Sequence, residues 1–188
     1  MFEIFYNFCF LFFFGWAVLC EKFAVGNVCY ALIGAAIPLM ISGGFHVDGY
    51  MDTMDAFHSY QSREKKLEIL EDSHIGAFAA IMLALYYMID IAAISEIHTQ
   101  KAVSALAAVF FLARCFSGIA VMTLQPAKKE GLLYTFASSA QKVRVKAALY
   151  FQAALCVVLM LLVSGWYGAA AIGAALLSFF YFKKKSYK

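Results

Sequence analysis

Charged side chains are scarce in this chain. Asp, Glu, Lys and Arg make up 14% of its 188 residues, whereas apolar residues make up 64% and the mean hydropathy is +0.76. Soluble domains carry about 25% charged and about 45–50% apolar residues. The shortage of charge therefore excludes an ordinary soluble domain and indicates an integral membrane protein.

Several sequence signatures are also missing. The five cysteines stand in apolar runs without C-x-x-C spacing, so we interpret them as small buried hydrophobes rather than metal ligands or a disulfide framework. The absence of a P-loop or a G-x-G-x-x-G motif excludes the usual cradles for nucleotide phosphates. Nothing in the sequence indicates nucleic-acid binding. Near the N-terminus, Glu3 stands where a signal peptide has positive charge, so we expect the first apolar run to be retained in the membrane.

Long apolar runs make up most of the chain. A helix needs about 20 apolar residues to cross about 30 Å of hydrocarbon. The last two runs are separated only by Gly165, which favours a tight hairpin over one broken element. We predict an all-α polytopic membrane helix bundle of about six transmembrane helices, forming a single integral membrane domain over residues 1–188. The runs cover residues 2–20, 23–44, 76–95, 102–124, 147–164 and 166–182.

Basic residues indicate the orientation of this bundle. Of the 15 Lys and Arg residues, three lie in 45–75, five in 125–146 and four after residue 182. With about six spans these three segments share one side, and the positive-inside rule places that side in the cytoplasm. We therefore expect a multi-pass protein of the prokaryotic cytoplasmic (inner) membrane, with the acidic helical segment 45–75 and both termini in the cytoplasm.

Acidic residues are concentrated in that segment: seven of the 12 lie between residues 43 and 78. Asp48, Asp52 and Asp55 have the spacing i, i+4, i+7, which places three carboxylates on one face of a helix. Like charges so close repel one another unless something compensates. A divalent cation would do so, and oxygen ligands favour Mg²⁺, Mn²⁺ or Ca²⁺.

A second acidic group follows, since Glu68 and Asp72 are again spaced i, i+4. Three basic residues lie between the two groups, at 63, 65 and 66. A Mg²⁺ ion bound by few carboxylates completes its shell with water and phosphate oxygens, so the pattern indicates a diphosphate site. The alternative is a solvated helix over 56–75 whose Glu and Lys residues pair along the surface. For Glu64 and Glu71 this alternative explains the sequence at least as well as a diphosphate site does.

Four further residues are candidates for catalysis or substrate binding. His46 and His74 each adjoin an acidic group and could accept a proton or orient a ligand, although a lone histidine is more often structural. Arg114 stands inside a predicted span, where it would contact a phosphate or pair with Asp90. Lys128, followed by another lysine, could bind nucleotide phosphates.

Two glycines flank the first acidic group. Gly43 and Gly49 would either let the backbone approach a substrate closely or simply end the preceding span.

The acidic stretch resembles a known signature. The run "GGFHVDGYMDTMDAFHSY", followed by "LEILEDSHIGAFA", is similar to the pattern G-G-x-H-x-D-G-x-x-D-T-x-D and L-E-I-(M/L)-x-D-S-x-I-G of the cobalamin (5′-phosphate) synthase family, the adenosylcobinamide-GDP ribazoletransferases. A later stretch, "LARCFSGIAVMTLQPAKKEGLLYTFA", resembles the family's second block. The likeness covers roughly residues 40 to 137. The second block matches through Arg114, Pro126, Ala127, Lys128, Gly131 and Leu132.

This resemblance implies a reaction. The adenosylcobinamide-phosphate group of adenosylcobinamide-GDP would pass to a hydroxyl of α-ribazole or its 5′-phosphate, and GMP would leave. It also implies roles for the residues above: catalysis by His46, His74 and Arg114, and substrate contacts by Lys128, Gly43 and Gly49. The ligands of one or two Mg²⁺ ions would be Asp48, Asp52, Asp55 and Asp72, with Glu68 as a direct or water-mediated ligand.

Other functions fit the residues less well. CDP-alcohol phosphotransferases expect D-G-x-x-A-R, whereas Asp48-Gly49 is followed here by Tyr-Met-Asp, and the N-D-x-x-D-x-x-x-D motif of membrane prenyltransferases is missing. A small cation transporter would carry its carboxylates within spans, where only Asp90 is well placed. A structural role without chemistry remains a further alternative.

Overall fold

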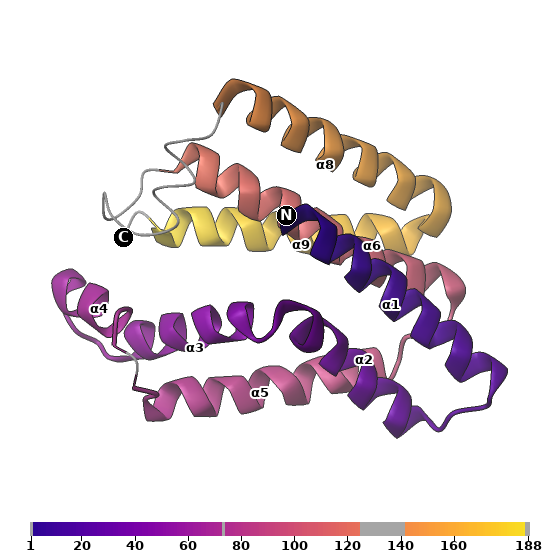
Figure 1. Ribbon diagram of the computed structural model, residues 1–188, viewed down its shortest axis with the longest axis horizontal. Helices are drawn as coiled ribbons and strands as arrows, with labels where there is room; N and C mark the ends of the chain where they lie inside the picture. The colour runs from indigo at the N-terminus through magenta and orange to yellow at the C-terminus, as the bar shows by residue number, and fades with distance from the viewer. Residues whose placement is uncertain (1, 73, 125–141, 187–188) are drawn as a thin grey trace. The chain divides into compact units, whose positions relative to one another are not determined.

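The computed structural model describes residues 2–72, 74–124 and 142–186, and all regular structure in these ranges is α-helical (Figure 1). The predicted all-α fold is therefore confirmed. The helices are α1 (Phe2–Lys22), α2 (Asn27–Ser42), α3 (Phe45–His58), α4 (Arg63–Ile69), α5 (Ala77–Ile94), α6 (Gln100–Thr123), α8 (Lys142–Ser164) and α9 (Trp166–Ser186).

Two compact units make up the structure, one from Met1–Phe14 with His98–Lys188 and the other from Gly15–Ile97. The first contains the start of α1 together with α6, α8 and α9. The second contains the rest of α1 and the helices from α2 to α5. A single membrane domain over the whole chain stays a prediction.

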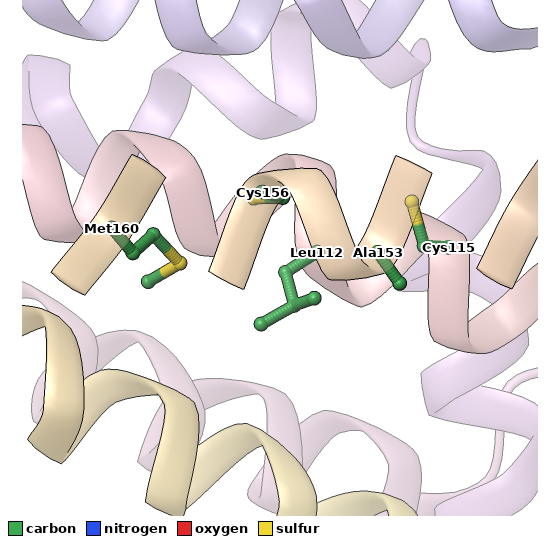
Figure 2. Packing of buried hydrophobic residues seen from close by; sticks show 5 residues of the cluster. All are labelled: Leu112, Cys115, Ala153, Cys156 and Met160. Carbon is green, nitrogen blue, oxygen red and sulfur yellow. The ribbon is translucent and has the colours of Figure 1, made fainter. Parts of the chain in front are cut away.

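The core of the first unit lies where α6 meets α8 and α9. Its buried residues recur three, four or seven positions apart along α6 and α8, so each helix presents one stripe to the other (Figure 2). The side chains of Leu112 and Met160 fill its centre at 0% and 2% exposure. The cluster consists of Leu112, Cys115, Ala153, Cys156 and Met160.

All five cysteines are free thiols in the structure, and the predicted burial is confirmed for four of them. The expectation of burial is wrong for Cys29, which is exposed on α2. The buried stripe of that helix starts at Tyr30 and continues through Ala31 and Gly34, and Cys29 lies outside it.

Gly165 joins α8 to α9 with a φ of 55°, a left-handed conformation that glycine adopts without steric cost. The two helices pack against each other, so the predicted hairpin is confirmed. Three residues later, Gly168 is buried, and a Cβ on it would run into the backbone carbonyl of Met160. The lack of a side chain at Gly168 therefore sets how closely the helices approach.

We expect Gly168→Ala to lower the free energy of unfolding by about 1–3 kcal/mol, because the obstacle is backbone that cannot rotate away. Gly173→Ala, in the same helix with nothing within 4 Å of the added carbon, is the matched control. Unfolding of both variants in detergent micelles measures the difference. Equal stability of the two variants would contradict the close approach.

The second unit turns sharply between α2 and α3. Gly43 ends α2 with a φ of 60°, and Gly44 follows with a φ of 85°. Two consecutive left-handed residues turn the chain sharply, and the two helices meet at 96°. The pair of glycines thus ends one apolar helix and starts the acidic one.

The helices α3 and α5 lie side by side in this unit (Figure 1). The Tyr50 hydroxyl donates to the Met82 carbonyl at 3.3 Å, and the rings of Tyr50 and Tyr86 lie 5.5 Å apart. At the other end of α5, the Tyr30 hydroxyl of α2 donates to the Ile97 carbonyl at 2.8 Å. These contacts hold α3 and α2 against α5.

Three helical stretches are long and apolar enough to cross a membrane: α5, α6 and Val143–Ser164 of α8. The bent pair of α2 and α3 makes a fourth if it is counted as one broken span. In the described part of the chain the number is three or four, so the predicted count of about six is not confirmed. Part of the difference lies in the run 23–44, whose helix has 16 residues, fewer than the roughly 20 of a straight crossing.

Candidate active site

The three aspartates of the first acidic group lie on α3. The helix is continuous from Phe45 to His58, so Asp48, Asp52 and Asp55 belong to one face. Asp48 is exposed, and the other two are half-buried. Both Asp48 and Asp55 act electrostatically on Asp52, which is the close grouping of like charges that their spacing predicts.

A divalent cation fits the donor chemistry of this face. Neighbours at i, i+4 have Cβ atoms about 5–6 Å apart, so the carboxylates of Asp48 and Asp52 can turn toward one ion. Among the residues that the structure describes, no three His, Cys, Asp or Glu side chains are placed so that they could hold a metal ion together. Water and phosphate oxygens would have to supply the rest of a Mg²⁺ shell, as they commonly do.

Asp55 contacts the start of α5. Its Oδ1 accepts a hydrogen bond from the Ala79 backbone N–H at 3.3 Å. Ala79 is the third residue of α5, where an N–H group has no partner within its own helix. The carboxylate also packs directly on Gly76, the residue before α5. Asp55 therefore caps α5 from the end of α3.

Glu68 lies on α4, a short exposed helix. The Glu68 carboxylate accepts from Lys65 Nζ at 2.7 Å, one helical turn earlier, and the two side chains are 66% and 59% exposed. That hydrogen bond raises the pKa of Lys65. Solvent screens such exposed pairs, so they contribute little to stability. This pairing matches the solvated-helix alternative, and a metal contact by Glu68 stays a prediction.

Asp72 and His74 form an exposed pair beyond α4. The His74 backbone N–H donates to Asp72 Oδ1 at 3.1 Å, and His74 Nδ1 lies 2.5 Å from the same oxygen. The side-chain hydrogen bond lowers the pKa of Asp72 and raises the pKa of His74. The pair is complete while Asp72 is ionised and His74 is protonated. The charge pairing is lost as the pH rises through the raised His74 pKa, where a neutral Nδ1–H can still donate to Asp72, or as the pH falls through the lowered Asp72 pKa.

We expect Asp72→Asn to lower the pKa of His74 toward its ordinary value of 6.5, because the charged acceptor is replaced by a neutral one. The imidazole proton shifts of His74, followed by NMR against pH, measure this change. Glu64→Gln, on exposed α4, is the control. A His74 pKa that is the same in all three proteins would show that the pair does not form.

The other residues predicted for the site lie in different surroundings. His46 precedes Asp48 by two positions, about 200° around α3, so it belongs to another face. Its ring meets Phe45 edge-on, with centroids 5.9 Å apart. Gly43 forms the C-cap of α2, and Gly49 lies inside α3 with open space around it.

Of the remaining predicted residues, one belongs to the first unit and the other lies outside the described residues. Arg114 is half-buried on α6 in the first unit, where it interacts electrostatically with Cys9 of α1. Its pairing with Asp90, a residue of the second unit, stays a prediction. Lys128, with the rest of 125–141, lies outside the described residues.

The sequence did not indicate the contacts between the end of α3 and the start of α5. His58 stacks on Phe78 with ring centroids 5.4 Å apart, beside the bond from Ala79 to Asp55. One residue of these contacts, Gly76, belongs to the family pattern L-E-I-(M/L)-x-D-S-x-I-G, but the sequence assigned no role to it.

Comparison with known proteins decides the family of this chain. A profile described as cobalamin-5-phosphate synthase matches residues 9–188. The chain belongs to this family. No solved structure matches it significantly.

Individual relatives agree with this family. A protein of Lachnoclostridium phytofermentans named adenosylcobinamide-GDP ribazoletransferase is 42% identical over 74% of the chain and 53% of its own length. Proteins of the same name from Mesorhizobium japonicum and Clostridium botulinum are 32% and 30% identical over 77% and 70% of the chain. The chain spans about half the length of the curated relatives it matches, at 55% and 52% for these two.

Proposed function

We propose that this member of the cobalamin-5-phosphate synthase family acts as an adenosylcobinamide-GDP ribazoletransferase. It would transfer the adenosylcobinamide-phosphate group of adenosylcobinamide-GDP to α-ribazole or its 5′-phosphate and release GMP. The observation that carries the proposal is the acidic face of α3 in a chain of this family. Relatives with this name support the choice of reaction.

The acidic face would bind the diphosphate through Mg²⁺. When bound, the cation neutralises negative charge on the transferred phosphoryl group and its leaving group. Asp48 and Asp52 are the ligands that this chain would supply first, because they share a face of α3, with Asp48 exposed and Asp52 half-buried. Asp72 would act at a second ion or through water, and Glu68 directly or through water, because in the described residues no three such side chains are grouped around one ion.

His74 would handle a proton at this site. Its Nδ1 is bonded to Asp72, which fixes the orientation of the ring and leaves Nε2 to face a substrate. In the neutral ring, Nε2 would take the proton from the attacking ribose hydroxyl. His46 and Arg114 would serve in orientation of the substrates, Lys128 in phosphate binding, and Gly43 and Gly49 in close approach of the backbone.

We also propose a cellular location for the protein. Three or four apolar helices support a membrane protein. We propose the cytoplasmic membrane of a prokaryote, with the acidic segment and both termini in the cytoplasm. The reason is that most Lys and Arg residues lie in 45–75, in 125–146 and after residue 182.

An assay of the detergent-purified chain tests the proposal. It contains adenosylcobinamide-GDP, α-ribazole and Mg²⁺, with cobamide and GMP followed by chromatography. We expect both products to appear together, to vanish with EDTA and to return with added Mg²⁺. If a longer relative works beside it and the chain forms no product, the chain lacks this activity; if EDTA has no effect, the metal role is wrong.

A further inference from the structure

The last turn of α3 and the first turn of α5 form a neck that closes the segment between them. Asp55 accepts from the Ala79 N–H at 3.3 Å, and the ring of His58 stacks on Phe78 with an interplanar angle of 17°. Gly76 lies under the Asp55 carboxylate. We define the neck as Asp55, His58, Gly76, Phe78 and Ala79. The described residues between its two ends include α4 and the Asp72–His74 pair.

The glycine in the neck is required for space rather than for backbone conformation. Gly76 has a φ of −81° and a ψ of 166°, which any residue adopts. It occupies the N-cap position of α5, where Ser, Thr, Asp or Asn usually provides an acceptor. A Cβ on Gly76 would overlap the Asp55 carboxylate. Asp55 thus provides from α3 the cap that residue 76 does not provide itself.

We infer that Asp55 is a positioning residue, whose acceptor oxygen fastens the start of α5 to the end of α3. By closing the neck it fixes the Asp72–His74 pair relative to the carboxylates of Asp48 and Asp52. A hydrogen-bond acceptor is sufficient for this role, so the negative charge of Asp55 is not essential to it. The fastening stands independently of the proposed function, and only its effect on transfer rests on that function.

Stability of the folded chain tests the fastening. In detergent micelles, Asp55→Ala and Gly76→Ala should each lower the Tm by about 2–4 °C, the shift that loss of one helix cap gives in a chain of this size. Each variant breaks the same contact, so the double variant should lie within about 1 °C of the lower single one. Asp55→Asn keeps the acceptor and should regain at least half of the loss.

Gly26→Ala is the matched control. Gly26 is the N-cap of α2 with a similar extended backbone, at φ −63° and ψ 147°, and nothing lies within 4 Å of an added carbon. Alanine is a poorer N-cap than glycine at both positions, so the control measures that shared cost, and Gly76→Ala should lower the Tm by at least about 2 °C more than Gly26→Ala. Additive losses in the double variant, or a Gly76→Ala protein as stable as Gly26→Ala, would overturn the inference.

Transfer kinetics separate positioning from metal binding. Asp55→Ala should lower kcat about tenfold at saturating Mg²⁺, because the Asp72–His74 pair is displaced. The half-saturating Mg²⁺ concentration of Asp55→Asn should stay within about twofold of the unmodified chain, whereas loss of a ligand raises it tenfold or more. Such a rise in an Asp55→Asn protein of unchanged Tm would overturn the inference. A chain without transfer activity counts against the proposed function alone, because the Tm series then decides the fastening.

Discussion

Asp52→Asn should lower the transfer rate by at least about 100-fold, the loss typical when one charge-stabilising group is removed from an active site. Asp52 stands between Asp48 and Asp55 on the acidic face and interacts electrostatically with both. Asn has nearly the same shape but lacks the charge that Mg²⁺ requires. The measurement is cobamide formation under saturating substrates, and the half-saturating Mg²⁺ concentration should rise together with the loss of rate.

Glu96→Gln provides the control, since Glu96 is an exposed carboxylate after the end of α5. Its transfer rate should stay within about twofold of that of the unmodified chain. Glu96 follows the end of α5 that is opposite to the contact with Asp55, and an exposed charge there contributes little to the site. Transfer by Asp52→Asn at the rate of the unmodified chain would remove the acidic face from the mechanism. Equal losses in both variants would point to a general effect of charge.

The double variant Gly43→Ala with Gly44→Ala should lose about 2–4 kcal/mol of stability, because each alanine forced into a left-handed conformation costs about 1–2 kcal/mol. The φ values of these residues are 60° and 85°, and they produce the 96° change of direction between α2 and α3. Unfolding in detergent micelles measures the loss. The direction of α3 relative to α2 should change as well, and with it the position of the acidic face. Mg²⁺-dependent transfer should therefore fall together with stability.

Gly49→Ala is the comparison for this pair. Gly49 lies inside α3 with nothing within 4 Å of an added carbon, and alanine in a helix interior is favoured over glycine by about 0.5–1 kcal/mol. The control should be at least as stable as the unmodified chain. A double variant that is equally stable would show that the left-handed turn is not required.

Much of the fold could be predicted from apolar runs and from glycine. Helices begin and end close to the predicted boundaries, and Gly165 marks the hairpin of α8 and α9. The predicted number of spans is not confirmed, in part because hydropathy does not reveal where a run bends. Run 23–44 reads as one crossing, yet its helix stops at Gly43 and continues in another direction as α3.

The acidic face of α3 could be predicted because spacing along a single helix fixes which residues share a face. The neck could not, since it joins Asp55 to Ala79 across a segment whose path depends on tertiary packing. His74 was found through its place beside Asp72, and the two do form a pair. His46 looked equally close to an acidic residue in sequence, but two positions along a helix lead to another face.

Binding of Mn²⁺, followed by electron paramagnetic resonance on the purified chain, tests most directly whether the acidic face of α3 holds a divalent cation. We predict saturable uptake of Mn²⁺, displacement of the bound ion by Mg²⁺, and affinity at least about tenfold weaker in Asp48→Asn and Asp52→Asn. Equal uptake by the unmodified chain and both variants would contradict a cation site on this face.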